Sequence, residues 1–170
     1  MHQTAFVKKF KERWQIQRNW QLVFPVLGIL ALVYSSIRLS IVIFDDIHWG
    51  IHAFLSIIIY FLLLKFFLFL FKKLENKWKV TYRWEMISIF LAFATTGSSS
   101  VFVSKPIMAL MGITKENLNL MLYWVLYIII GLIFYQILLL FFGWVFGQFA
   151  FFWNFEKKML KRIGFKRFLD

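Results

Sequence analysis

The chain of 170 residues contains no cysteine, only two prolines and only eight acidic residues. Without cysteine, disulfides, thiolate metal sites and cysteine nucleophiles are all excluded. No nucleophile elbow, phosphate-binding loop or pair of carboxylates suited to acid and base catalysis is recognisable in the sequence. We therefore expect no bound cofactor and no metal, and a non-catalytic role is favoured over an enzymatic one.

Apolar residues are abundant in this chain. They make up 61% of the sequence, including 23 phenylalanines and 8 tryptophans, and the mean hydropathy is +0.72. A soluble domain of this length does not tolerate such a composition, whereas lipid contact and interfacial anchoring require it. The composition therefore predicts an all-α, polytopic membrane protein.

Four apolar stretches each have about the 20 residues needed to cross a bilayer. The predicted spans cover residues 20–44, 51–71, 84–103 and 120–142, with a further helix possible past Pro106 as far as Met111. The first stretch is too long for a cleaved signal peptide and is predicted to be retained. After the fourth span, residues 143–155 predict a helix that leaves the membrane or bends along its surface.

Two parts of the chain share a pattern at matching distances. Trp14 precedes the first span and Trp20 begins it, while Trp78 and Trp84 stand in the same way to the third span. Ser35-Ser36 and Ser99-Ser100 follow at equal distances. The match predicts two tandem two-helix hairpins related by a parallel repeat. The predicted domains are a basic amphipathic segment (1–19), the first hairpin (20–71), a basic linker (72–83), the second hairpin (84–155) and a basic tail (156–170).

The basic residues gather on one side of the predicted spans. Only Arg38, Lys65, Lys105 and Lys115 lie elsewhere. The others are Lys8, Lys9, Lys11, Arg13, Arg18, Lys72, Lys73, Lys77, Lys79, Arg83, Lys157, Lys158, Lys161, Arg162, Lys166 and Arg167. By the positive-inside rule, both termini and the linker are cytoplasmic.

The net charge of +12 requires an anionic partner. Because the basic clusters lie beside the membrane and alternate with Trp and Phe, anionic lipids on the cytoplasmic side are favoured over nucleic acid. An acidic membrane protein partner, or a second copy of the chain, is the alternative. No nucleic acid partner is expected.

A run of small polar residues lies in the third span, at residues 95–100. Such residues permit close helix packing and bond back to their own helix, which is the simpler interpretation. The alternative is a lipid or anion site formed by Ser98, Ser99, Ser100 and Lys105, with Pro106 ending the regular helix beside it. Arg38 either reaches the outer headgroups alone or shares one phosphate with Lys105.

Three other residues are candidates for helix contacts. Gly143 and Gly147 are four apart and would share a helix face, and Gln136 would form a hydrogen bond between helices. The segment 45–52 holds two carboxylates and two histidines, with the histidines four apart. A solvated acidic turn is favoured there over a metal site, because no third cluster supplies ligands.

The second half of the chain carries recognisable segments. Gly143-Trp144-Val145-Phe146-Gly147-Gln148-Phe149 and Phe152-Trp153-Asn154-Phe155-Glu156-Lys157-Lys158 are the specific ones. Residues 77–166 resemble a family of small uncharacterised inner-membrane proteins of Bacteroidota-type bacteria. Some members are labelled diacylglyceryl transferase, which would imply a phospholipid substrate and a lipoprotein acceptor.

The sequence favours an accessory, scaffold or assembly subunit that binds lipid or a membrane protein partner. The runner-up is an enzyme of phospholipid or lipoprotein modification that uses Ser98–Ser100, Lys105 and Arg38. A small transporter or channel is a third possibility, which would need an oligomer because one copy lines a pore poorly.

Overall fold

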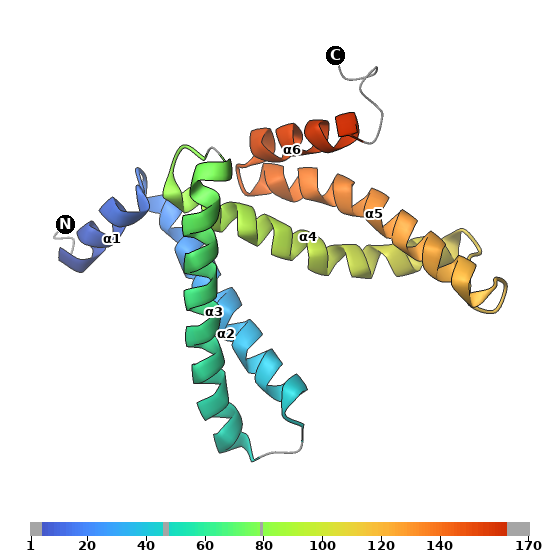
Figure 1. Ribbon diagram of the computed structural model, residues 1–170, viewed down its shortest axis with the longest axis horizontal. Coiled ribbons are helices and arrows are strands. Elements are labelled where there is room, and N and C mark those ends of the chain that lie inside the picture. Colours follow the sequence, from blue (N-terminus) through green and yellow to red (C-terminus); the bar gives the residue numbers. More distant parts are fainter. Residues whose placement is uncertain (1–4, 46–47, 79, 163–170) are drawn as a thin grey trace. The chain divides into compact units, whose positions relative to one another are not determined.

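The computed structural model describes residues 5–45, 48–78 and 80–162, and every regular element in these ranges is helical (Figure 1). The elements are α1 (Ala5–Trp14), the 3-10 turn η1 (Asn19–Leu22), α2 (Val23–Ile43), α3 (Trp49–Trp78), α4 (Arg83–Leu110), α5 (Leu120–Val145) and α6 (Phe149–Arg162). The chain divides into two compact units, Met1–Ile87 and Ser88–Asp170. Four charged residues of the predicted topology, Asp46, Lys79, Lys166 and Arg167, lie outside the described residues.

Four helices are long and apolar enough to cross a membrane. They cover Asn19–Ile43, Trp49–Glu75, Arg83–Leu110 and Leu120–Val145. At 1.5 Å per residue, helices of 25 to 28 residues exceed the roughly 30 Å of a hydrocarbon core. The predicted all-helical architecture is confirmed for the described residues, and its four long apolar helices are compatible with an integral membrane protein.

In the first unit, α2 and α3 form a hairpin. Ser40 on α2 is fully buried, and its hydroxyl lies 3.1 Å from Nδ1 and 3.2 Å from the carbonyl oxygen of His52 on α3. The Ser56 hydroxyl donates to the same carbonyl at 2.7 Å. His52 therefore ties the two spans together, and no group of three potential metal ligands forms in the ranges the structure covers.

An aromatic cluster closes the other end of this unit. Trp84, in the first turn of α4, stacks on Phe24 at 5.1 Å and meets Trp20 edge-on at 6.0 Å, measured between ring centroids. Trp14 at the end of α1 meets Phe71 on α3 edge-on at 6.0 Å. These contacts hold the end of α1 and the start of α4 against the spans of the first unit.

In the second unit, α6 folds back along α5. Phe152 on α6 is fully buried beside Gly143, where a Cβ atom would lie 2.5 Å from the Phe152 ring. The short turn between α5 and α6 contains Gly147, whose φ of +71° favours glycine. The sequence predicted a helix that leaves the membrane or follows its surface. The structure packs this helix, α6, against α5, and its position relative to a membrane stays a prediction.

The third span contains Pro106. The lipid-site alternative had Pro106 end the regular helix, but α4 continues through it to Leu110, in line with the possible continuation to Met111. The helix ends at Gly112, whose φ is +70° and whose N–H donates to the carbonyl of Ala109 at 3.0 Å. A proline inside a membrane helix is tolerated where neighbouring groups satisfy the freed backbone.

The close approach of α6 to Gly143 predicts a steric effect. Gly143→Ala should destabilise the α5–α6 pair by roughly 1–3 kcal/mol, because the added methyl group overlaps the buried Phe152 ring. Gly97→Ala is the matched control, since nothing lies within 4 Å of a Cβ at that position. Thermal unfolding in detergent measures both variants. Equal melting temperatures for the two would contradict the tight contact.

Candidate functional site

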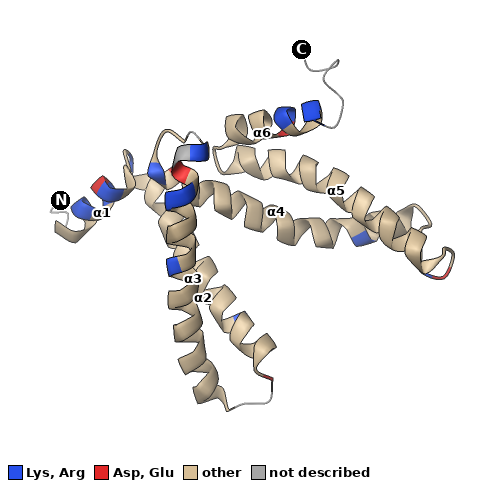
Figure 2. Ribbon diagram, viewed as in Figure 1, with Lys and Arg blue, Asp and Glu red and all other residues tan. Residues whose placement is uncertain are grey.

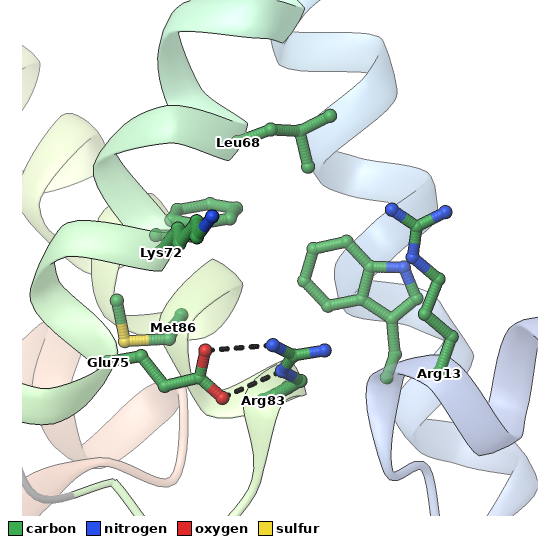
Figure 3. Close-up of a pocket in the computed structure, with 8 residues that line it drawn as sticks. Arg13, Leu68, Lys72, Glu75, Arg83 and Met86 are labelled. Atoms are coloured by element: carbon green, nitrogen blue, oxygen red, sulfur yellow. Dashed lines mark hydrogen bonds and ion pairs between the residues drawn. The ribbon is translucent and has the colours of Figure 1, made fainter.

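A pocket of about 210 Å³ opens in the first unit where α1 ends, α3 ends and α4 begins (Figure 3). It is lined by Arg13, Trp14, Leu68, Phe71, Lys72, Glu75, Arg83 and Met86. Half of these side chains are charged and half are apolar. The pocket therefore offers both a polar and an apolar surface to one ligand.

Helical spacing explains why α3 supplies half of the lining. Residues 68, 71, 72 and 75 lie at i, i+3, i+4 and i+7, which is a single helix face. This face is apolar toward the middle of the span and charged toward its end. Arg83 and Met86 come from the first turn of α4, and Arg13 and Trp14 from the last turn of α1.

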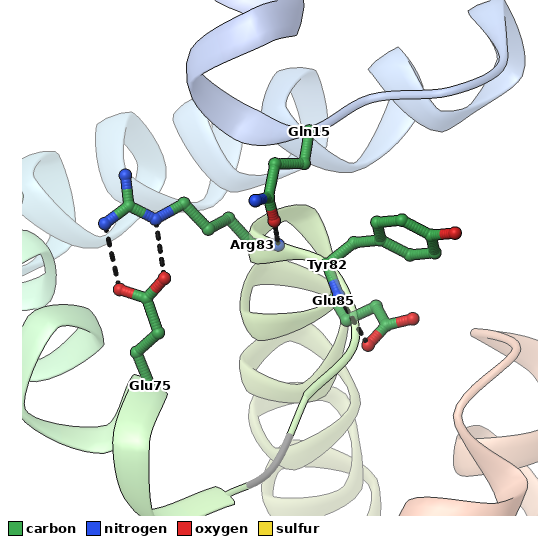
Figure 4. Close-up of polar contacts among 5 residues, drawn as sticks. All are labelled: Gln15, Glu75, Tyr82, Arg83 and Glu85. Carbon is green, nitrogen blue, oxygen red and sulfur yellow. Dashed lines mark hydrogen bonds and ion pairs between the residues drawn. The ribbon is translucent and has the colours of Figure 1, made fainter.

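An ion pair crosses the floor of the pocket (Figures 3 and 4). The Arg83 guanidinium donates from Nε to Glu75 Oε1 at 2.7 Å and from Nη2 to Glu75 Oε2 at 2.9 Å. Such a two-bond pair fixes the geometry of both side chains. Because the Arg83 and Glu75 side chains are 46% and 33% exposed, the pair contributes little to stability and more to position.

Gln15 links the end of α1 to the start of α4 (Figure 4). Its side-chain oxygen accepts from the backbone N–H of Arg83 at 3.1 Å. Gln15 itself has a φ of +55°, and the N–H of Ile16 donates to the Lys11 carbonyl at 2.9 Å, as in a Schellman motif. Gln15 thus occupies a backbone position that favours glycine, and its side chain holds the backbone of Arg83 in place.

Glu85 organises the connection that precedes α4 (Figure 4). Its Oε2 accepts from the backbone N–H groups of Thr81 at 2.8 Å and Tyr82 at 3.3 Å. A carboxylate in this position caps the start of a helix and complements its dipole. Thr81 and Tyr82 are therefore held against the first turn of α4.

Two cations of the pocket have no carboxylate partner. Arg13 and Lys72 form no ion pair in the part of the chain that the structure covers, whereas Arg83 is paired with Glu75. Three cations against one carboxylate leave an excess of two positive charges around an aromatic and aliphatic wall. Such an arrangement suits an amphiphilic anion. The sequence predicted a basic region here but did not identify this site.

The predicted outer site consists mostly of hydroxyls that bond within their own helix. On α4, Ser98 donates to the Ala94 carbonyl at 2.9 Å, and Ser100 donates to the Gly97 carbonyl at 3.0 Å. Ser99 lies between them, and Lys105 is exposed farther along α4. Arg38 is exposed on α2 and belongs to the other unit, so its pairing with Lys105 stays a prediction.

The predicted helix-contact residues occupy different positions. Gly143 contacts α6, while Gly147 lies in the turn after α5 with nothing within 4 Å of a Cβ, so the two share no helix face. Gln136 lies on α5 beside Met159 and Glu156 of α6. With its amide nitrogen toward Glu156, it donates to Oε2 at 3.2 Å and also to Oε1. In the opposite amide orientation, the side-chain oxygen of Gln136 would face the carboxylate oxygens of Glu156, and both groups are acceptors.

Glu156 is a buried carboxylate that sequence reasoning missed. It shares the face of α6 with Phe152, four residues before it, and its residue exposure is only 4%. Tyr135, next to Gln136 on α5, interacts with it electrostatically. Burial raises the pKa of Glu156 above its ordinary value. The signal in the sequence was an acidic residue on the apolar face of an amphipathic helix.

Comparison with known proteins finds a family match in the second half of the chain. Residues 88–167, a little under half of the chain, match a family of unknown function (DUF6787). The match lies almost wholly inside the 77–166 region in which a family resemblance was predicted, and the matching family is itself of unknown function. No curated protein matches the chain, and no solved structure does.

The raised pKa of Glu156 predicts a dependence of stability on pH. Glu156 binds its proton more tightly when α6 is packed against α5 than when α6 is detached from it. The packing is therefore strongest below the ordinary glutamate pKa of about 4.3. Packing weakens as the pH rises through the raised value. Glu156→Gln should abolish this loss, because the amide stays neutral.

Thermal unfolding in detergent between about pH 4 and pH 8 tests the effect. The advantage of Glu156→Gln over the native chain should grow with pH, while Glu116→Gln, at an exposed carboxylate, should follow the native chain. An advantage that does not change with pH would contradict the assignment of Glu156.

Proposed function

We propose that this chain is a non-catalytic accessory or scaffold protein of a bacterial inner membrane that holds anionic lipid at its basic end. The observation that carries the proposal is the pocket of the first unit. Its excess of two positive charges stands beside an apolar wall that continues along α3. A lipid presents the same combination of anionic headgroup and hydrocarbon.

The distribution of charge around the pocket supports the proposal. Within the first unit, basic residues gather on α1, at the end of α3 and at the start of α4, and few lie along α2 and the rest of α3 (Figure 2). An anionic leaflet attracts such residues with about 1 kcal/mol for each cation near the surface. The positive-inside rule would place this end in the cytoplasm.

The helix α1 has the pattern of an interfacial helix. Phe6, Phe10 and Trp14 lie at i, i+4 and i+8, and Lys8, Lys9 and Lys11 lie around the rest of the helix. Phe6 is 78% exposed, so its ring is free to enter a lipid surface. A helix of this kind would lie in the headgroup region and bring Arg13 to the level of lipid phosphates.

A membrane protein partner is the second candidate for the same basic end. It would use acidic residues in place of lipid phosphates. The two candidates separate in one experiment, native mass spectrometry of the protein extracted gently from its own membrane. Retained anionic lipid supports the proposal, and a stoichiometric protein partner without lipid would replace it.

The inner pocket and the predicted outer site give different results in that experiment. If the pocket holds the lipid, Arg38→Ala and Lys105→Ala should leave the bound-lipid profile unchanged, because both residues lie outside the pocket. Loss of lipid in either variant would instead place the lipid at the outer candidates, Arg38, Ser98–Ser100 and Lys105.

The proposed orientation is testable because the native chain has no cysteine. Lys9→Cys on α1 and Glu116→Cys in the segment between α4 and α5 each introduce one exposed thiol. A membrane-impermeant maleimide added to intact spheroplasts should label the cysteine at 116 alone. Permeabilisation should then expose the cysteine at 9. The reverse pattern would invert the topology.

A further inference from the structure

We infer that the pocket between α1, α3 and α4 binds a phosphate monoester, the headgroup chemistry of a phosphatidic-acid-type lipid or of a free phosphomonoester. The inference rests on the proposed function and names the ligand class of the same site. It rests on the number of pocket cations that form no ion pair within the described residues, on the helices that carry them, and on the apolar side chains that line the rest of the pocket.

The number of free charges matches a dianion. Arg83 is neutralised by Glu75 through two hydrogen bonds of 2.7 and 2.9 Å, whereas Arg13 and Lys72 form no ion pair within the described residues. A phosphate monoester carries about −1.5 to −2 charges at pH 7. A phosphodiester headgroup such as that of phosphatidylglycerol carries one charge and would leave one cation unmatched.

The cations surround the pocket from three helices (Figure 3). Arg13 comes from α1, Lys72 from α3 and Arg83 from α4. The terminal oxygens of a monoester are strong acceptors, so donors from three directions can each reach one. The Arg83 guanidinium keeps further N–H groups beyond the two that Glu75 accepts.

Glu75 contributes to the choice of ligand. Its carboxylate holds Arg83 at a fixed position and removes that charge from the total. Without Glu75, three free cations would attract any anion. With Glu75, a ligand that brings more negative charge than two cations can match meets a nearby carboxylate, and repulsion disfavours it.

The apolar side chains explain where the rest of a lipid would lie. Leu68 is four residues before Lys72 on the same face of α3, and Phe71 and Trp14 form the aromatic contact next to it. A glycerol backbone and acyl chains can follow this wall toward the apolar middle of α3. A free phosphomonoester would use only the charged side of the pocket.

The experiment measures lipid binding to the purified full chain by native mass spectrometry in detergent. The probes are phosphatidic acid, phosphatidylglycerol and glycerol phosphate, at equal concentrations. Phosphatidic acid should bind more tightly than phosphatidylglycerol. Glycerol phosphate reports whether the headgroup alone suffices, and binding of it at equal strength would identify a free phosphomonoester as the ligand.

The variants Arg13→Gln and Lys72→Gln should each lower the affinity for phosphatidic acid roughly tenfold, as expected for the loss of one charge-assisted hydrogen bond. Lys73→Gln is the matched control, because it removes the same charge from the adjacent exposed position outside the pocket. An equal loss in Lys73→Gln would overturn the site and leave a diffuse attraction to anionic lipid. Unchanged melting temperatures verify that the variants are folded.

A pH series adds a second readout. Because the second pKa of a phosphate monoester is about 6, the affinity for phosphatidic acid should fall between about pH 7.5 and pH 5, while that for phosphatidylglycerol should not. Equal binding of both lipids at every pH would overturn the monoester inference but not the proposed function. Binding of neither lipid would overturn both.

Discussion

Hydrocarbon excludes charge, and the layout of this molecule depends on that constraint. A charged side chain in the middle of a bilayer costs at least about 2.5 kcal/mol, so the four apolar helices carry few charges, and most basic residues lie near the ends of these helices or on the shorter helices α1 and α6. Helices α1 and α6 carry much of this charge, and both are amphipathic. Each packs against a span within its own unit, α1 through Trp14 on Phe71 and α6 through Phe152 on Gly143.

The same constraint gives the two polar sites their properties. At the pocket, exposed cations lie beside apolar side chains of α3, so the local surface suits a molecule that is itself charged at one end and apolar at the other. At the α5–α6 contact, Glu156 is buried and has a polar partner in Gln136. Burial there favours the neutral carboxyl group, which makes the contact responsive to pH.

Local patterns in the sequence were sufficient for the spans and insufficient for the sites. The length and hydropathy of each apolar run predicted four membrane helices, because those properties belong to single helices. The pocket combines Arg13, Lys72 and Arg83 from three helices, and only tertiary contacts such as Trp14 on Phe71 bring them together. Glu156 was missed because α6 folds back after Gly147. At Pro106 the sequence left open whether the helix ends or continues, and it continues because a membrane helix can accommodate proline. The parallel repeat and the orientation stay predictions.

The central claim is that a lipid phosphate lies between α1 and α3, and a direct measurement is the proximity of phosphorus to side-chain nitrogen. Solid-state NMR of the nitrogen-15-labelled protein in bilayers containing phosphatidic acid can detect dipolar coupling between lipid phosphorus and the nitrogens of Arg13 and Lys72. The account predicts strong dephasing of both signals by phosphorus and weak dephasing of Lys73, which lies outside the pocket. Equal dephasing of Lys72 and Lys73, or none at Arg13, would contradict it.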